Sequence, residues 1–149
     1  MKRVEIVQLG LGYVGRAVAQ TIIEERKRWR EELNLDLHYH AVADTSGALI
    51  GEELLPQAIR LKEDGGKLAT LGVEPIKEVL ASEPPPHTTR VVVDLAVHGG
   101  TFDLDLLGVR NGSCLVLSNK GPLSGSGAEY KELLRAAGDR MWHEATVGA

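Results

Sequence analysis

Apolar residues along this chain follow two alternating patterns, one typical of buried strands and the other typical of amphipathic helices. Five short apolar runs predict strands at residues 4–9, 37–44, 90–96, 113–117 and 141–145. Segments with helical spacing lie between them at residues 16–32, 52–62, 75–82, 101–109 and 129–137. Strands that alternate with helices form parallel sheets, because each crossover returns the chain to the same end of the sheet. We therefore expect an α/β fold with a doubly wound, mostly parallel sheet and helices on both faces.

The spacing within the helical segments predicts which faces pack on the sheet. In the first helix the i, i+3, i+4, i+7 rule selects one face formed by Val14, Ala17, Val18, Thr21 and Ile22. The last helix has an inward set of the same kind, formed by Tyr130, Leu133, Leu134 and Ala137. At the helix of residues 101–109, Thr101 is expected to act as the N-cap.

A glycine-rich turn joins the first strand to the first helix. Gly10, Gly12 and Gly15 form a Gly-x-Gly-x-x-Gly motif directly after an apolar run and directly before a helical segment. Gly10 allows a sharp turn, Gly12 leaves room for a pyrophosphate beside the main chain, and Gly15 lets the helix lie close to the sheet. The helix N-terminus adds free N–H groups for the phosphates. This context predicts a dinucleotide site in a Rossmann-type sheet, and a merely structural turn is the alternative.

Acidic residues stand in two of the expected strands near their carboxyl ends. Asp44 occupies the position at which a Rossmann-type fold accepts hydrogen bonds from the adenosine ribose hydroxyls, although it could instead only cap the next segment. A carboxylate repels a 2′-phosphate, and no Lys or Arg lies between Asp44 and Leu54 to receive one, so NAD is slightly favoured over NADP. Asp94 is expected to hold the following loop through backbone hydrogen bonds.

Composition and charge narrow the class of protein. The chain has 149 residues, of which 26% are charged, and a formal net charge of −4. An acidic balance disfavours nucleic acid as a partner, since phosphate binding needs a basic surface. No apolar run approaches about 20 residues, so no membrane span is expected. Cys114 is the single cysteine, which excludes an internal disulfide and fits the cytoplasm, and its apolar surroundings predict a buried, inert thiol.

Three motifs in a fixed order resemble one enzyme family. They are Gly-Leu-Gly-Tyr-Val-Gly at residues 10–15, Leu-Ser-Asn-Lys-Gly-Pro-Leu at 117–123 and His-Glu-Ala-Thr-Val-Gly-Ala at 143–149. Together they resemble the N-terminal NAD(P)-binding domain of homoserine dehydrogenase, over essentially the whole chain. That family interconverts L-homoserine and L-aspartate 4-semialdehyde with NAD or NADP, in the biosynthesis of threonine and methionine.

The resemblance also implies roles for single residues. Gly12, Tyr13 and Val14 match the loop that holds the pyrophosphate, and Ala96 stands where the family usually has a threonine near the nicotinamide. Lys120 matches the lysine that reaches cofactor and substrate, and it is the expected catalytic residue. The expected cofactor-binding set is therefore Gly10, Gly12, Tyr13, Val14, Gly15, Asp44, Ala96 and Lys120. A sodium ion is expected at the oxygens of Glu144, Val147 and Ala149.

The same resemblance predicts an incomplete enzyme. In the family, a second domain beyond the Glu-Ala-Thr-Val motif carries the substrate-binding carboxylates and the principal catalytic lysine. Residues 1–149 are then an NAD(P)-binding domain without the substrate domain, and they should not turn over homoserine alone. The alternatives are a non-catalytic NAD(P)-binding module or regulatory fragment, and another amino-acid dehydrogenase of similar layout. An uncovered patch of sheet would promote self-association, so a homo-oligomer is expected.

Overall fold

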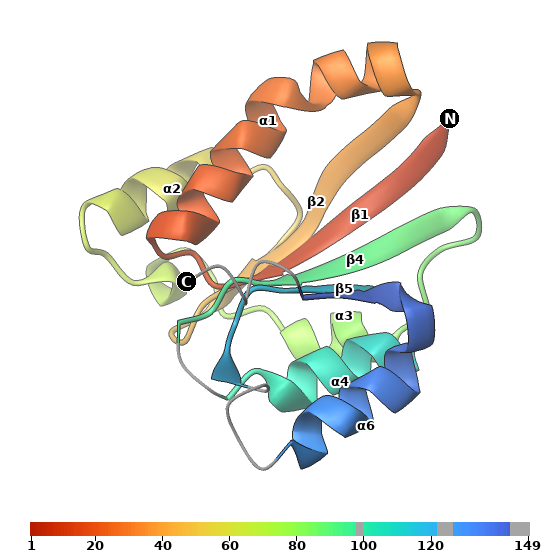
Figure 1. The fold of residues 1–149 in the computed structure, drawn as a ribbon. Helices are drawn as coiled ribbons and strands as arrows, with labels where there is room; N and C mark the ends of the chain where they lie inside the picture. Colours follow the sequence, from red (N-terminus) through yellow and green to blue (C-terminus); the bar gives the residue numbers. More distant parts are fainter. Residues whose placement is uncertain (98–99, 122–126, 144–149) are drawn as a thin grey trace.

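The structure, a computed structural model, describes residues 1–97, 100–121 and 127–143 (Figure 1). Its strands are β1 (Lys2–Leu9), β2 (Leu35–Ala43), β3 (Ala48–Ile50), β4 (Thr88–Asp94), β5 (Cys114–Leu117) and β6 (Met141–Trp142). Its helices are α1 (Tyr13–Leu33), α2 (Leu55–Glu63), α3 (Ile76–Ala81), α4 (Phe102–Arg110) and α6 (Ala128–Ala137), with 3₁₀ turns at Leu68–Thr70 and Gly138–Arg140. Each strand and helix expected from the sequence is present, with its ends shifted by a few residues, and residues 144–145 of the last expected strand lie outside the described residues.

The strands form one sheet in the order β3-β2-β1-β4-β5-β6. β1 pairs in parallel with both β2 and β4, and β5 and β6 continue the parallel half. β3 pairs with β2 in the antiparallel sense, and the sequence did not predict it because a strand this short shows no periodicity. The strand order reverses beside β1, so the chain leaves a crevice between the carboxyl ends of β1 and β4. The expected Rossmann-type, doubly wound sheet is confirmed.

Helices cover both faces of this sheet (Figure 1). α1 and α2 lie on one face, where Ala19 and Ala58 belong to one core cluster. α3, α4 and α6 lie on the other face, where Leu80 and Leu133 belong to a second cluster. Leu134 of α6, predicted to face inward, is 38% exposed instead. Within the described ranges, no helix combines the length and the apolar character that crossing a membrane requires.

α1 packs only part of its predicted apolar face against the core. Its buried residues are Gly15 and Ala19, whereas Tyr13 is 84% exposed and Val14 is 55% exposed. The predicted face lines a shallow surface groove formed by Tyr13, Val14, Ala17, Val18, Thr21, Ile22 and Trp29. Small residues let α1 lie close to the sheet, and Ile22 of the predicted face packs partly buried against the core cluster that contains Ala19, whereas Val14 stays exposed. The predicted inward face of α1 is therefore confirmed at Ile22 and wrong at Val14.

A buried ion pair joins the neighbouring strands β1 and β4. The Arg90 Nε atom donates a hydrogen bond of 2.5 Å to Glu5 Oε1, and both residues are 2% exposed. Arg90 Nη1 also donates to the carbonyl oxygens of Val79 (2.7 Å) and Ser82 (2.6 Å), which ties the end of α3 to β4. Charges buried this deeply are tolerated because each one has partners.

Replacement of Glu5 by Gln should leave the Arg90 charge buried without its carboxylate. We expect Glu5→Gln to lower the free energy of unfolding by about 3 kcal/mol, because loss of one partner leaves an uncompensated charge. Urea denaturation followed by circular dichroism measures this loss. Glu132→Gln is the matched control, since the surface pair of Glu132 with Arg110 should contribute less than about 1 kcal/mol. Equal losses in the two variants would contradict the prediction.

Candidate functional site

A cavity of about 480 Å³ opens at the carboxyl ends of β1, β2 and β4. Its lining comes from the turn after β1, the end of β2, the loop after β4 and the helices α2 and α4. Four of the expected cofactor-binding residues line it, namely Gly10, Gly12, Asp44 and Ala96. The tertiary structure thus brings together residues that lie in three separate parts of the sequence.

The turn between β1 and α1 depends on backbone contacts that glycine alone permits. Gly10 has a φ of +101°, and a Cβ atom there would lie 2.7 Å from the carbonyl carbon of Leu95. A Cβ atom on Gly15 would collide with the carbonyl oxygen of Gly10. Gly12 is different, because its φ is −76° and no other described part of the chain comes within 4 Å of its Cβ position. The fold therefore needs Gly10 and Gly15, whereas Gly12 leaves free space at the N-terminus of α1.

Gln8 supports this turn from inside the protein, and the sequence analysis did not identify it. Its buried side-chain Nε2 donates hydrogen bonds to the carbonyl oxygens of Gly10 (2.9 Å) and Gly15 (3.0 Å). The Tyr39 hydroxyl donates to Gln8 Oε1 at 2.7 Å, and burial raises the pKa of Tyr39, so that this hydroxyl keeps its proton. The signal in the sequence is an amide side chain within an apolar strand, two residues before Gly10.

Asp44 shapes the turn after β2 and also faces the cavity. Its Oδ1 accepts hydrogen bonds from the backbone N–H groups of Ser46 (2.7 Å) and Gly47 (3.0 Å) and from the Ser46 hydroxyl (2.7 Å). Its Oδ2 accepts from Lys62 Nζ at 2.8 Å. Burial alone would raise the pKa of Asp44, but the hydrogen bonds from Lys62, Ser46 and Gly47 together hold it below its ordinary value. The carboxylate is therefore ionised at neutral pH, and Oδ2 retains a lone pair for a ribose hydroxyl.

Lys62 adds a cation to this end of the cavity. The sequence did not predict this cation, because Lys62 lies on α2, beyond the stretch from Asp44 to Leu54, and reaches Asp44 only through the tertiary structure. The side chain of Lys62 is 22% exposed and lines the cavity. The capping role considered for Asp44 is confirmed by its bonds to the following turn, and its contact with a ribose stays a prediction.

Asp94 joins the loops at the other end of the cavity. This residue is fully buried, and its Oδ1 accepts from the backbone N–H of Ala96 at 3.0 Å, as predicted for a residue that holds this loop. Its Oδ2 accepts from the Thr101 hydroxyl (2.7 Å) and from Asn119 Nδ2 (3.2 Å). Thr101 stands at the N-cap position of α4, but its side chain makes no capping hydrogen bond. The expected side-chain cap was therefore wrong, because the Thr101 hydroxyl binds Asp94 instead.

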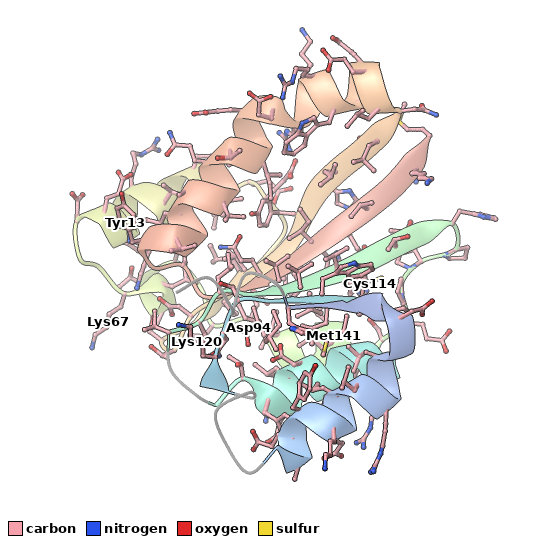
Figure 2. All side chains as sticks on the ribbon, viewed as in Figure 1. Tyr13, Lys67, Asp94, Cys114, Lys120 and Met141 are labelled. Carbon is pink, nitrogen blue, oxygen red and sulfur yellow. The ribbon has the colours of Figure 1, made fainter. Side chains whose placement is uncertain are left out.

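Lys120 follows β5 at the same edge of the sheet as Asp94 (Figure 2). Lys120 is exposed, and the described residues that line the cavity do not include it. Its neighbour Asn119 is buried, donates to Thr101 Oγ1 at 2.9 Å and accepts from the Gly121 N–H at 2.9 Å. Asn119 thus fixes the turn that carries Lys120, while the catalytic role of Lys120 stays a prediction.

Several other predicted residues lie away from the cavity. Tyr13 and Val14 begin α1 on its exposed side, so their contact with a pyrophosphate stays a prediction. The expected sodium ligands, which are Glu144, Val147 and Ala149, lie outside the described residues. In the part of the chain that is described, no group of three or more His, Cys, Asp or Glu residues is placed to hold a metal ion. Cys114 is only partly buried, contrary to expectation, and burial still raises the pKa of its thiol.

The fold and the cavity define a class of protein. A parallel sheet whose order reverses beside β1, a glycine turn with free space before α1 and an acid after β2 are together features of a Rossmann-type dinucleotide-binding fold. No protein-family model matches the chain. The chain is similar to known homoserine dehydrogenases, and the resemblance seen in its motifs is thereby confirmed.

This similarity extends over almost the whole chain. The homoserine dehydrogenase of Pyrococcus horikoshii is 28% identical over 151 residues, which cover 99% of this chain and 45% of that protein. The homoserine dehydrogenase of Methanocaldococcus jannaschii is 29% identical over 160 residues, which cover 97% of this chain and 45% of that protein. A hyperthermophilic archaeal homoserine dehydrogenase solved in complex with NADPH matches 97% of this chain and 44% of its own, with 26% identity and a TM-score of 0.75. The chain thus spans about 45% of the length of the curated relatives that it matches.

Two glycines of the turn should respond differently to an added methyl group. Gly15→Ala is expected to lower the free energy of unfolding by about 2 kcal/mol, because the new Cβ collides with the Gly10 carbonyl oxygen. Gly12→Ala should change it by less than about 0.5 kcal/mol, since the space there is open. Urea denaturation of both variants beside the parent chain measures the difference. A Gly12→Ala variant as unstable as Gly15→Ala would show that the turn is more closely packed than the structure indicates.

Proposed function

We propose that this chain binds a nicotinamide dinucleotide across the carboxyl edge of its sheet. The observation that carries the proposal is the free space beside Gly12 at the N-terminus of α1. Unpaired N–H groups and the positive end of the helix dipole favour a pyrophosphate at such a position. Asp44 then receives the adenosine ribose, and Ala96 borders the nicotinamide end of the same cavity.

The activity that we propose is the interconversion of L-homoserine and L-aspartate 4-semialdehyde with NAD or NADP, in threonine and methionine biosynthesis. Two relatives that are named homoserine dehydrogenase support it, as does a matched structure in complex with NADPH. A bound dinucleotide supplies the hydride chemistry, and the residues of this chain bind and orient it. Lys120 is the proposed catalytic residue, because a cation at the end of β5 can polarise the substrate oxygen.

Residues 1–149 act, on this proposal, as the NAD(P)-binding domain of a longer enzyme. The share of the relatives that the chain matches, about 45%, supports a separate substrate domain. A non-catalytic NAD(P)-binding module or a regulatory fragment is the alternative, and it requires the same ligand without the reaction. A chimera in which this chain replaces the matching part of the Pyrococcus horikoshii relative distinguishes the two, since turnover of homoserine by the chimera favours the enzyme domain.

Three further parts of the proposal concern a metal, the assembly and the location. A sodium ion is proposed at Glu144, Val147 and Ala149 on the resemblance alone. A homo-oligomer is supported by the apolar groove along α1, because exposed apolar patches mark protein contacts. A cytoplasmic location rests on the single cysteine, Cys114, which fits a reducing compartment.

NAD is proposed as the slightly favoured cofactor. The Asp44 carboxylate can accept a hydrogen bond from a free 2′-hydroxyl and repels a 2′-phosphate. Lys62 acts in the opposite sense, because its ammonium lies 2.8 Å from Asp44 Oδ2 and would attract a 2′-phosphate. Since both groups stand at the same end of the cavity, the preference between the two cofactors should be small.

Titration calorimetry with NADH tests the binding proposal. We expect the parent chain to bind NADH and Gly12→Ala to bind at least about tenfold more weakly, because its methyl group occupies the space for the pyrophosphate. Gln20→Ala, on the exposed side of α1, is the matched control and should bind like the parent chain. With NAD and homoserine present, the absorbance of reduced cofactor should not rise. Full affinity in Gly12→Ala would contradict the proposed position of the pyrophosphate.

The cofactor preference should move in opposite directions when the charges of Asp44 and Lys62 are removed. We expect Asp44→Asn to shift the ratio of NAD to NADP affinity toward NADP, and Lys62→Met to shift it toward NAD, each by about tenfold. Lys67→Met removes the same charge from an exposed residue and should leave the ratio unchanged. Calorimetric titration of each variant with both cofactors gives the ratios. Shifts of the same sign in both variants would rule out the proposed position of the adenosine ribose.

A further inference from the structure

Two buried aspartates are linked through Thr101, whose hydroxyl donates to Asp94 Oδ2 at 2.7 Å and whose carbonyl oxygen accepts from the Asp105 N–H at 2.9 Å. Asp94 ends β4 and Asp105 stands in the first turn of α4, and both residues are 0% exposed. Asp94 accepts hydrogen bonds from the Ala96 N–H, the Thr101 hydroxyl and the Asn119 amide. Among the described residues, no donor reaches either carboxyl oxygen of Asp105.

A proton on Asp105 accounts for this arrangement. A buried carboxylate without donors is unstable, and two ionised carboxylates side by side repel each other strongly in a protein interior. Burial and the neighbouring Asp94 carboxylate raise the pKa of Asp105 to about 10. The protonated Asp105 is itself a donor, and the acceptor beside it is Asp94. The pair then carries a single negative charge, which the three donors around Asp94 stabilise.

We propose that Asp105, as the protonated partner of Asp94, is a positioning residue for the loops that border the nicotinamide end of the dinucleotide site. This inference rests on the proposed function, since it requires a dinucleotide across this edge of the sheet. Asp94 contacts two loops at this end of the cavity. It holds the N–H of Ala96, which lines the cavity, and it binds Asn119, which fixes the turn that carries Lys120.

The two ends of the cavity are built from separate groups, which makes the role of Asp105 testable. The adenosine end is held by Asp44 with its partners Ser46, Gly47 and Lys62. None of these hydrogen bonds involves Asp94 or its partners. A change at Asp105 should therefore weaken ligands that carry a nicotinamide and leave ligands without one unaffected.

NADH and ADP-ribose are the two probes, titrated by calorimetry into the parent chain, Asp105→Ala and Asp105→Asn. Asp105→Ala should bind NADH at least about fivefold more weakly, as loss of one buried hydrogen bond implies, and ADP-ribose with unchanged affinity. Asp105→Asn keeps a donor of the same shape and should bind both probes like the parent chain. Unchanged NADH affinity in Asp105→Ala, or equal loss of both probes, would overturn the inference. A parent chain that does not bind ADP-ribose would instead overturn the proposed function, and the inference with it.

A second measurement keeps the inference testable if Asp105→Ala does not fold. At roughly pH 8 the infrared spectrum of the parent chain should contain the carbonyl band of a protonated carboxylic acid, and Asp105→Asn should lack it. The melting temperature of the parent chain should also fall more steeply than that of Asp105→Asn between about pH 5 and pH 9. The reason is that an acid with a raised pKa takes up a proton on folding, so stability declines as pH rises. Absence of the band, or identical pH slopes, would overturn the inference.

Discussion

The close approach of α1 to the end of β1 is the contact on which the rest of this structure depends. Gly15 lies so near the carbonyl oxygen of Gly10 that no side chain fits between them, and Gln8 binds the carbonyl groups of both residues. Backbone atoms rather than side chains set this distance, so the N-terminus of α1 is held firmly over the edge of the sheet. The free space at Gly12 and the crevice between β1 and β4 both follow from that position.

The two ends of the crevice are stabilised by different physical means. After β2, Asp44 and Lys62 form an ion pair whose side chains are 9% and 22% exposed. After β4, the buried Asp94 is held by neutral donors from two loops. The proposed adenosine end thus depends on a charged pair, and the proposed nicotinamide end on a buried carboxylate with neutral donors.

The exposed side of α1 shows how a correct helix prediction can place part of a face wrongly. The apolar stripe from Val14 to Ile22 is real, but Ile22 packs against the core while Val14 is 55% exposed. The fully buried residues of α1 are the small Gly15 and Ala19, and Val14 lines the surface groove instead. In the relatives, this domain accounts for less than half of the protein, so a helix with two apolar sides is compatible with contacts beyond the domain.

The sequence by itself determined the alternation of strands and helices, the glycine turn and the acid after β2. These features depend on local periodicity and on the sterics of neighbouring backbone atoms, which a short stretch of chain specifies. Only the tertiary structure decided that Lys62 meets Asp44, 18 residues away, and that Asn119 meets Asp94, 25 residues away. The same holds for the buried position of Asp105 and for the short strand β3. Contacts of this kind leave no local pattern, because strand pairing and helix packing bring their partners together.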